Sequence, residues 1–255
     1  DGRHAPVSDA GRLVAFEPQA LPHAQLHASL LMLGSARIPS AVVAYRAAAG
    51  AKDGGVASIP TLDDRGAPQN FAQLSLVEGA FHGRPDADEY ENYTVPVRSI
   101  DSVLKEMSLA CPSLIKVDVE GQEDDALRGA AKTIKKCRPV LYVENNHYPA
   151  AGIATRHCRG AGYVAFHHAF SYAALYPRPR SREEAAYHAD VADRSDSRNL
   201  LCVASAERLA GLPETIFLEV VPGWESAAAA LPPDLLARLT RPVDEAVLYP
   251  NRGAP

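Results

Sequence analysis

Two carboxylates, Asp118 and Glu120, directly follow a short apolar segment at 114–117 and precede Gly121 and a helix-forming run from Asp124 to Lys136. In an open α/β sheet, ligands bind where the carboxyl end of a strand leads into the next helix. A carboxylate at such a position can orient or deprotonate a hydroxyl group, or it can hold a cation. The pattern therefore predicts a chemical site at this turn.

Acids also follow two other predicted strands. Glu17 comes after the first strand, and Glu144 comes after the strand that follows the Asp118 turn. Because the carboxyl ends of parallel strands lie at one edge of a sheet, we expect Glu17, Asp118, Glu120 and Glu144 to share a crevice. A carboxylate that accepts hydrogen bonds from two ribose hydroxyls is a usual nucleoside-binding group on such sheets, and this is the role predicted for Glu17. The alternative is that each acid caps a helix or lies in solvent.

Two further arrangements could carry chemistry. The oxygen atoms of Asp118, Glu144 and Asn145 could together hold a hard cation such as magnesium. The adjacent residues His167 and His168 follow an aromatic strand, and either could act as a general base, because the pKa of an unperturbed imidazole lies near neutrality. A histidine that is hydrogen-bonded within a loop is the structural alternative.

Strand and helix signals alternate along the first two thirds of the chain. Strands are expected at 12–16, 41–45, 94–98, 114–117 and 140–143, and helices at 21–33, 102–109 and 124–136. Continuously apolar strands that alternate with helices indicate an α/β fold whose mostly parallel sheet is covered by helices on both faces.

The alternation weakens after residue 150. A helix is expected near 150–161, strands at 163–166 and 200–203, and a last helix at 232–239. We expect one domain over 1–203, with a long polar excursion at 63–94, and a C-terminal extension at 204–255 packed on the same domain. A long excursion within a compact domain is often functional.

Composition excludes several classes of protein. Of the 255 residues, 47% are hydrophobic and 22% are charged, which is typical of a globular domain. A net charge of −5 without an evident basic stripe argues against a nucleic-acid partner. No apolar run approaches the roughly 20 residues that span a bilayer, so no membrane partner is expected.

The four cysteines are Cys111, Cys137, Cys158 and Cys202. Their wide spacing matches neither a zinc-binding pattern nor a dense disulfide framework. We therefore expect buried, reduced thiols and a cytoplasmic location.

Several segments, taken in order, resemble one known family. The segments are GRLVAFEPQ at 11–19, NF at 70–71, VPVRSID at 95–101, IKVDVEGQE at 115–123, LRGA at 127–130 and RPVLYVEN at 138–145. Together they are similar to the FkbM family of S-adenosylmethionine-dependent methyltransferases. The resemblance extends over roughly residues 11–203.

The resemblance implies a class I methyltransferase fold with a Rossmann-like sheet, and S-adenosyl-L-methionine as the cofactor. It implies that Glu17 binds the cofactor ribose, that Phe16 and Pro18 lie beside the adenine, and that Asp118 lies next to the methyl-transfer centre. The reaction expected of the family is usually O-methylation of a hydroxyl on a natural product or a sugar. Three residues would orient or deprotonate that hydroxyl: Glu120, Glu144 and His168.

The sequence departs from the family pattern at its start. A strand and a glycine-rich loop that cradles the methionine end of the cofactor should precede Gly11. Asp1-Gly2 could be the end of that loop, which makes Gly2 a candidate cofactor contact, but no counterpart of the strand is present. We expect that the sequence omits residues of the whole protein.

Two other functions remain as alternatives. One is a Rossmann-like domain that binds a nucleoside or a partner without catalysis. The other is an NAD-dependent oxidoreductase, since Glu17 could equally bind an NAD ribose, although no GxGxxG turn is present. The expected partner is a small hydroxylated acceptor, and a homo-oligomer is compatible with the sequence.

Overall fold

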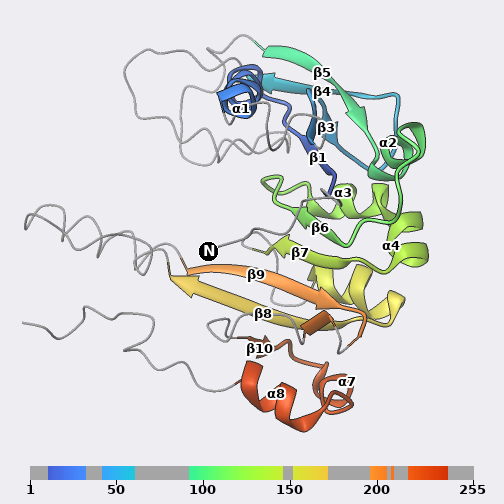
Figure 1. The fold of residues 1–255 in the computed structure, drawn as a ribbon, viewed down its shortest axis with the longest axis vertical. Coiled ribbons are helices and arrows are strands. Elements are labelled where there is room, and N and C mark those ends of the chain that lie inside the picture. Colours follow the sequence, from blue (N-terminus) through green and yellow to red (C-terminus); the bar gives the residue numbers. More distant parts are fainter. Residues whose placement is uncertain are drawn as a thin grey trace, which may run out of the picture.

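The chain folds as a mixed α/β protein with three sheets among the residues that the structure, a computed structural model, describes (Figure 1). The described residues are 11–32, 42–60, 92–145, 152–171, 196–205, 208–209 and 218–240. Strands β1 (Leu13–Phe16) and β2 (Val42–Tyr45) form a two-stranded parallel sheet. Strands β3 (Ala48–Ala49), β5 (Asn92–Arg98) and β4 (Val56–Pro60) form a second sheet in that order.

The third sheet has five strands in the order β10-β8-β9-β7-β6. Its strands are β6 (Leu114–Val117), β7 (Val140–Glu144), β8 (Val164–Ser171), β9 (Asp196–Val203) and β10 (Glu219–Val220). Only the β6–β7 pair is parallel, because β9 lies antiparallel between β7 and β8, and β10 is antiparallel to β8. A mostly parallel sheet is therefore not confirmed: apolar content predicted the strands but carried no information on their direction.

Four of the described helices precede β7: α1 (Ala20–Met32), α2 (Ile100–Glu106), α3 (Glu123–Gly129) and α4 (Ala131–Cys137). The single helix predicted over 124–136 is divided at Ala130. At the division, Gly129 lies so close to the carbonyl oxygen of Gly50 that a β-carbon would come within 2.1 Å of it. Asp101 accepts hydrogen bonds from the amides of Lys132 and Thr133, and so caps the new helix α4.

The later part of the chain packs on the five-stranded sheet. The segment predicted as a helix near 150–161 contains a π-helix, η3 (Ala154–Cys158), and a 3₁₀ turn, η4 (Arg159–Ala161). It is followed, beyond β9, by α7 (Glu225–Ala228) and α8 (Pro233–Leu239), the second close to the predicted 232–239. Trp224 is buried in the core, and its indole nitrogen donates a hydrogen bond to the Tyr163 carbonyl at 2.9 Å. No helix within the described ranges is both long and apolar enough to cross a membrane.

All four cysteines form disulfide bonds, so the expectation of reduced thiols is wrong. Cys111 is bonded to Cys137 and Cys158 to Cys202, with Cα–Cα distances of 5.3 Å and 6.3 Å. Partners separated by 26 and 44 residues meet only because the fold brings them together, which spacing along the chain does not reveal. The cytoplasmic expectation depended on reduced thiols and loses that support.

We expect the Cys158–Cys202 bond to be the more important of the two for stability. Both of its cysteines are fully buried and it joins η3 to β9. Replacing both by alanine should lower the free energy of unfolding by about 2–4 kcal/mol, measured by urea unfolding followed through Trp224 fluorescence. The Cys111→Ala, Cys137→Ala double variant is the comparison and should lose less. Titration of four free thiols in the unreduced, denatured protein would contradict the pairing.

Candidate functional site

A cavity of about 410 Å³ lies between the end of β1 and the turn that follows β6. This volume falls within the usual range for small-molecule sites. Its lining contains five of the predicted site residues: Phe16, Glu17, Pro18, Asp118 and Glu120. The remaining lining residues are Gln19, Pro22, Gln25, Ala48, Ala49, Ile59, Val119 and Gln122. The fold thus brings the predicted cofactor residues of β1 beside the acidic turn.

Glu17 is held at the end of β1 by the local backbone. Its amide donates to the Tyr45 carbonyl at 3.0 Å, and its Oε1 accepts a hydrogen bond from the Gln19 amide at 2.8 Å. Partial burial raises the pKa of Glu17 above its usual value, although the Gln19 amide and nearby His23 act in the opposite direction. Phe16 stacks on Tyr45, with 5.9 Å between the ring centroids. The carboxylate is therefore fixed in place and partly shielded from water.

The acidic turn after β6 has an unusual backbone. Glu120 and Gly121 both have positive φ angles, of 50° and 97°. Glycine adopts this conformation without strain, but glutamate does not, and such residues are common at functional sites. Gly121 was predicted as the glycine of a tight turn, and this is confirmed.

The side chain of Glu123 stabilises this turn, a role that the sequence did not predict. Its carboxylate oxygen Oε1 accepts hydrogen bonds from the Val119 amide at 3.2 Å and the Gly121 amide at 3.0 Å. The side chain is fully buried at the first residue of α3. An acid in the first turn of a helix is favoured by the helix dipole, which is the signal that could have identified it.

We expect Glu123→Ala to lower the free energy of unfolding by about 2–4 kcal/mol, because two amides of the turn lose their acceptor in a buried position. Glu123→Gln, which keeps one acceptor oxygen, should cost about 1 kcal/mol. Urea unfolding measures both. The control is Asp125→Ala on the same helix, which removes an exposed ion pair with Arg128 and should change stability by less than about 0.5 kcal/mol. Equal losses at positions 123 and 125 would remove the structural role given to Glu123.

Three carboxylates meet at the edge of the β6–β7 pair. Asp118, Glu120 and Glu144 each place an oxygen within 4.8 Å of the others. Asp118 also accepts a hydrogen bond from Lys116 at 2.6 Å. The cluster adds Glu120 to the predicted Asp118 and Glu144. The predicted Asn145 is buried directly after Glu144. The oxygen ligands of the cluster are of the kind that a hard divalent cation takes.

His168 belongs to the same edge of the sheet. Across the strands, Glu144 lies opposite Asn199, and Asn199 lies opposite His168, so the three form one row. The Nδ1 atom of His168 is 2.8 Å from the hydroxyl oxygen of Tyr142, and burial lowers the pKa of the imidazole below its usual value. His167 is buried, and because successive side chains of a strand point to opposite faces, it lies on the other face of the sheet from His168. His168 is not part of the cavity lining, and Gly2 lies outside the described residues.

Comparison with known proteins points to one family. The model of the methyltransferase FkbM domain matches residues 4–188. None of the curated proteins compared with the chain matches it significantly. A solved structure, methyltransferase FkbM from Methylobacillus flagellatus KT, is 18% identical; the match covers 75% of this chain and 36% of that one, with a TM-score of 0.43.

The chain spans little more than a third of the length of that solved protein. The domain match covers well over half of the present sequence and includes the β1 end, the acidic turn and Glu144. The chain therefore belongs to the FkbM methyltransferase family.

Proposed function

We propose that this protein is an S-adenosylmethionine-dependent methyltransferase that binds its cofactor in the cavity between β1 and the acidic turn. The observation that carries the proposal is the meeting of Glu17 with Asp118 and Glu120 in one cavity, although a hundred residues of sequence separate them. Family membership supports the same cofactor.

The residues of the cavity fit the cofactor in chemical type. Glu17 offers a fixed carboxylate for the two ribose hydroxyls, and Phe16 and Pro18 offer apolar surface to an adenine ring. Asp118, which lines the same cavity, would lie next to the methyl-transfer centre. When bound, the cofactor supplies a methyl group on a positively charged sulfur, and much of the rate of its in-line transfer comes from positioning.

The acceptor in this proposal is a hydroxyl group of a small natural product or sugar, which becomes a methyl ether. Its proton must be removed as the new carbon–oxygen bond forms. His168, with its lowered pKa, is neutral near neutral pH and can accept that proton. Glu120 and Glu144, which lie together with Asp118, are the other candidates to orient the hydroxyl or to accept the proton.

A divalent cation at Asp118, Glu120 and Glu144 is a further part of the proposal. The convergence of three carboxylates supports it, since neighbouring negative charges repel one another unless a proton or a cation lies between them. A cation there would lower the pKa of a bound hydroxyl and so help the same proton transfer.

The experiment is a calorimetric titration of the protein with S-adenosylhomocysteine, in the presence of magnesium or of EDTA, with NAD as the control. A dissociation constant in the micromolar range for the thioether, and no binding of NAD, is the expected result. Tighter binding of NAD would favour the oxidoreductase alternative. Binding of neither nucleoside would exclude a cofactor site in this chain. Equal affinity with magnesium and with EDTA would mean that a cation does not help to bind the cofactor, so that any role for it would be in the reaction of the acceptor hydroxyl.

A further inference from the structure

A second cavity, of about 840 Å³, is distinct from the candidate cofactor site. It is formed by α2, α4, the loop after β3 and the segment that leads into β6, and α2 and α4 lie side by side (Figure 1). The linings of the two described cavities share no residue. We call this second cavity the basic groove.

The basic groove is strongly cationic in a chain whose net charge is −5. Five cations line it and are all exposed: Lys52, Lys105, Arg128, Lys132 and Lys136. Three of them recur every fourth residue, with Arg128 in the last turn of α3 and Lys132 and Lys136 on α4, and we call these three the stripe. The four lysine side chains make no ion pair with any described residue, and Arg128 pairs only with the exposed Asp125 within the same part of the chain. The stripe corrects the expectation that no basic stripe is present.

The two acids of the groove are already engaged by the fold. Asp101 accepts hydrogen bonds from the Lys132 amide at 2.9 Å, the Thr133 amide at 2.8 Å and the Thr133 hydroxyl at 2.7 Å. Its two oxygens therefore serve to join α2 to α4. They are not available to pair with the lysine side chains.

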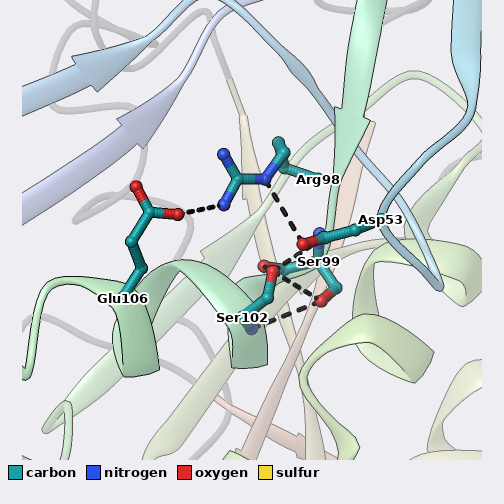
Figure 2. Close-up of polar contacts among 5 residues, drawn as sticks. All are labelled: Asp53, Arg98, Ser99, Ser102 and Glu106. Carbon is teal, nitrogen blue, oxygen red and sulfur yellow. Dashed lines mark hydrogen bonds and ion pairs between the residues drawn. The ribbon is translucent and has the colours of Figure 1, made fainter.

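Asp53 is engaged in the same way, as Figure 2 shows. It accepts hydrogen bonds at 2.6 Å from both the Ser99 amide and the Ser102 hydroxyl, and Arg98 lies 3.5 Å away. These bonds tie the loop after β3 to the first turn of α2. The groove is thus preformed, and its free charges are positive.

The hydrogen-bond pattern distinguishes between kinds of anionic ligand. A compact phosphate is usually held by backbone amides at the start of a helix. Here the first amides of α4 donate to Asp101, and the amides of Ser99 and Ser102 donate to Asp53 and to the Ser99 hydroxyl. What remains is a set of long, exposed lysine side chains together with five apolar residues of the lining, which we call the apolar floor: Leu104, Leu109, Ala110, Pro112 and Ala131.

We propose that the basic groove is a docking site for an acidic, partly apolar segment of a partner protein. Alternating carboxylates would pair with the stripe and with Lys105 across from it, while apolar side chains of the same segment would cover the floor. Complementary charge of this kind speeds association and selects the partner. The Cys111–Cys137 bond lines the groove and fixes the end of α4 against the segment before β6.

The test uses a fluorescent amphipathic peptide of glutamate and leucine, with binding followed by fluorescence anisotropy. The wild-type chain should bind it, and raising the salt concentration from about 0.05 M to 0.3 M should weaken binding because the charges are exposed. The double variant Lys132→Glu, Lys136→Glu should bind at least about tenfold more weakly. Lys135→Glu is the matched control, since this neighbour on α4 is exposed but does not line the groove; its effect should stay below about twofold.

Three results would overturn the proposal: no binding of the peptide, equal weakening by Lys135→Glu, or tighter binding of tripolyphosphate or single-stranded RNA that the Lys132, Lys136 reversal abolishes. The last would assign the groove to a phosphate ligand. S-adenosylhomocysteine affinity should be unchanged in all these variants, so the outcome is independent of the proposed methyltransferase function. A peptide of lysine and leucine should not bind in any case.

Discussion

Replacement of Glu17 by alanine should weaken S-adenosylhomocysteine binding about 10²–10³-fold. The side chain is proposed to accept two hydrogen bonds from the ribose hydroxyls, and charge-assisted bonds of this kind contribute about 1.5–2 kcal/mol each. The carboxylate is already positioned by the Gln19 amide, so the ligand does not have to order it. Calorimetric titration of the variant beside the wild-type chain gives the result directly.

Glu17→Gln is the matched control for this prediction. It keeps the volume and one acceptor oxygen, so we expect an intermediate loss of about tenfold. Burial raises the pKa of Glu17 in the folded chain, so the stability linked to this group is present at low pH and is lost as the pH rises through the raised pKa. At neutral pH the glutamine variant should therefore be as stable as the wild type or slightly more so. Wild-type affinity in Glu17→Ala would remove the ribose role.

The raised pKa of Glu17 also sets how the affinity for S-adenosylhomocysteine depends on pH. Because only the ionised carboxylate accepts from both hydroxyls, affinity should fall as the solution is acidified. The fall should begin at a higher pH than for an ordinary glutamate of pKa 4.5, because partial burial favours the protonated form. In Glu17→Gln this acid-side loss should disappear.

The site was more predictable from the sequence than the sheet that carries it. Glu17, Asp118 and Glu144 each follow an apolar strand, and that pattern alone placed them at strand ends. The pattern could not show that β9 lies antiparallel between β7 and β8, because the apolar composition of a strand does not depend on its direction in the sheet. The pairing depends on contacts between residues far apart in the sequence.

Features that depend on such distant contacts were missed throughout. The helix break at Ala130 depends on the approach of Gly50, and each disulfide depends on the fold as a whole. The stripe of Arg128, Lys132 and Lys136 is readable at four-residue spacing, but only the fold sets Lys105 across from it. A net charge of −5 averages over the chain and conceals a local excess of the opposite sign.

Replacement of His168 by glutamine should lower kcat about 10²–10⁴-fold, the usual contribution of a general base, once an acceptor hydroxyl has been identified for the assay. Affinity for S-adenosylhomocysteine should change less than twofold, because His168 does not line the described cofactor cavity. Release of S-adenosylhomocysteine measures turnover, and calorimetry measures binding. A parallel loss of both would indicate a structural defect instead of a missing base.

The dependence of kcat on pH shows whether His168 or one of the carboxylates is the general base. Burial lowers the pKa of His168 below its usual value, so the neutral imidazole should be retained, and kcat held level, to a lower pH than for an ordinary histidine. The imidazole accepts a proton at Nε2 only in the tautomer whose Nδ1–H donates to the Tyr142 oxygen, 2.8 Å away. Tyr142→Phe removes this hydrogen-bond partner of Nδ1 and should cost about tenfold, well short of the loss in His168→Gln. If His168→Gln keeps the wild-type kcat and its acid limb, the proton goes to Glu120 or Glu144, and the row from Glu144 through Asn199 to His168 serves to hold the sheet edge.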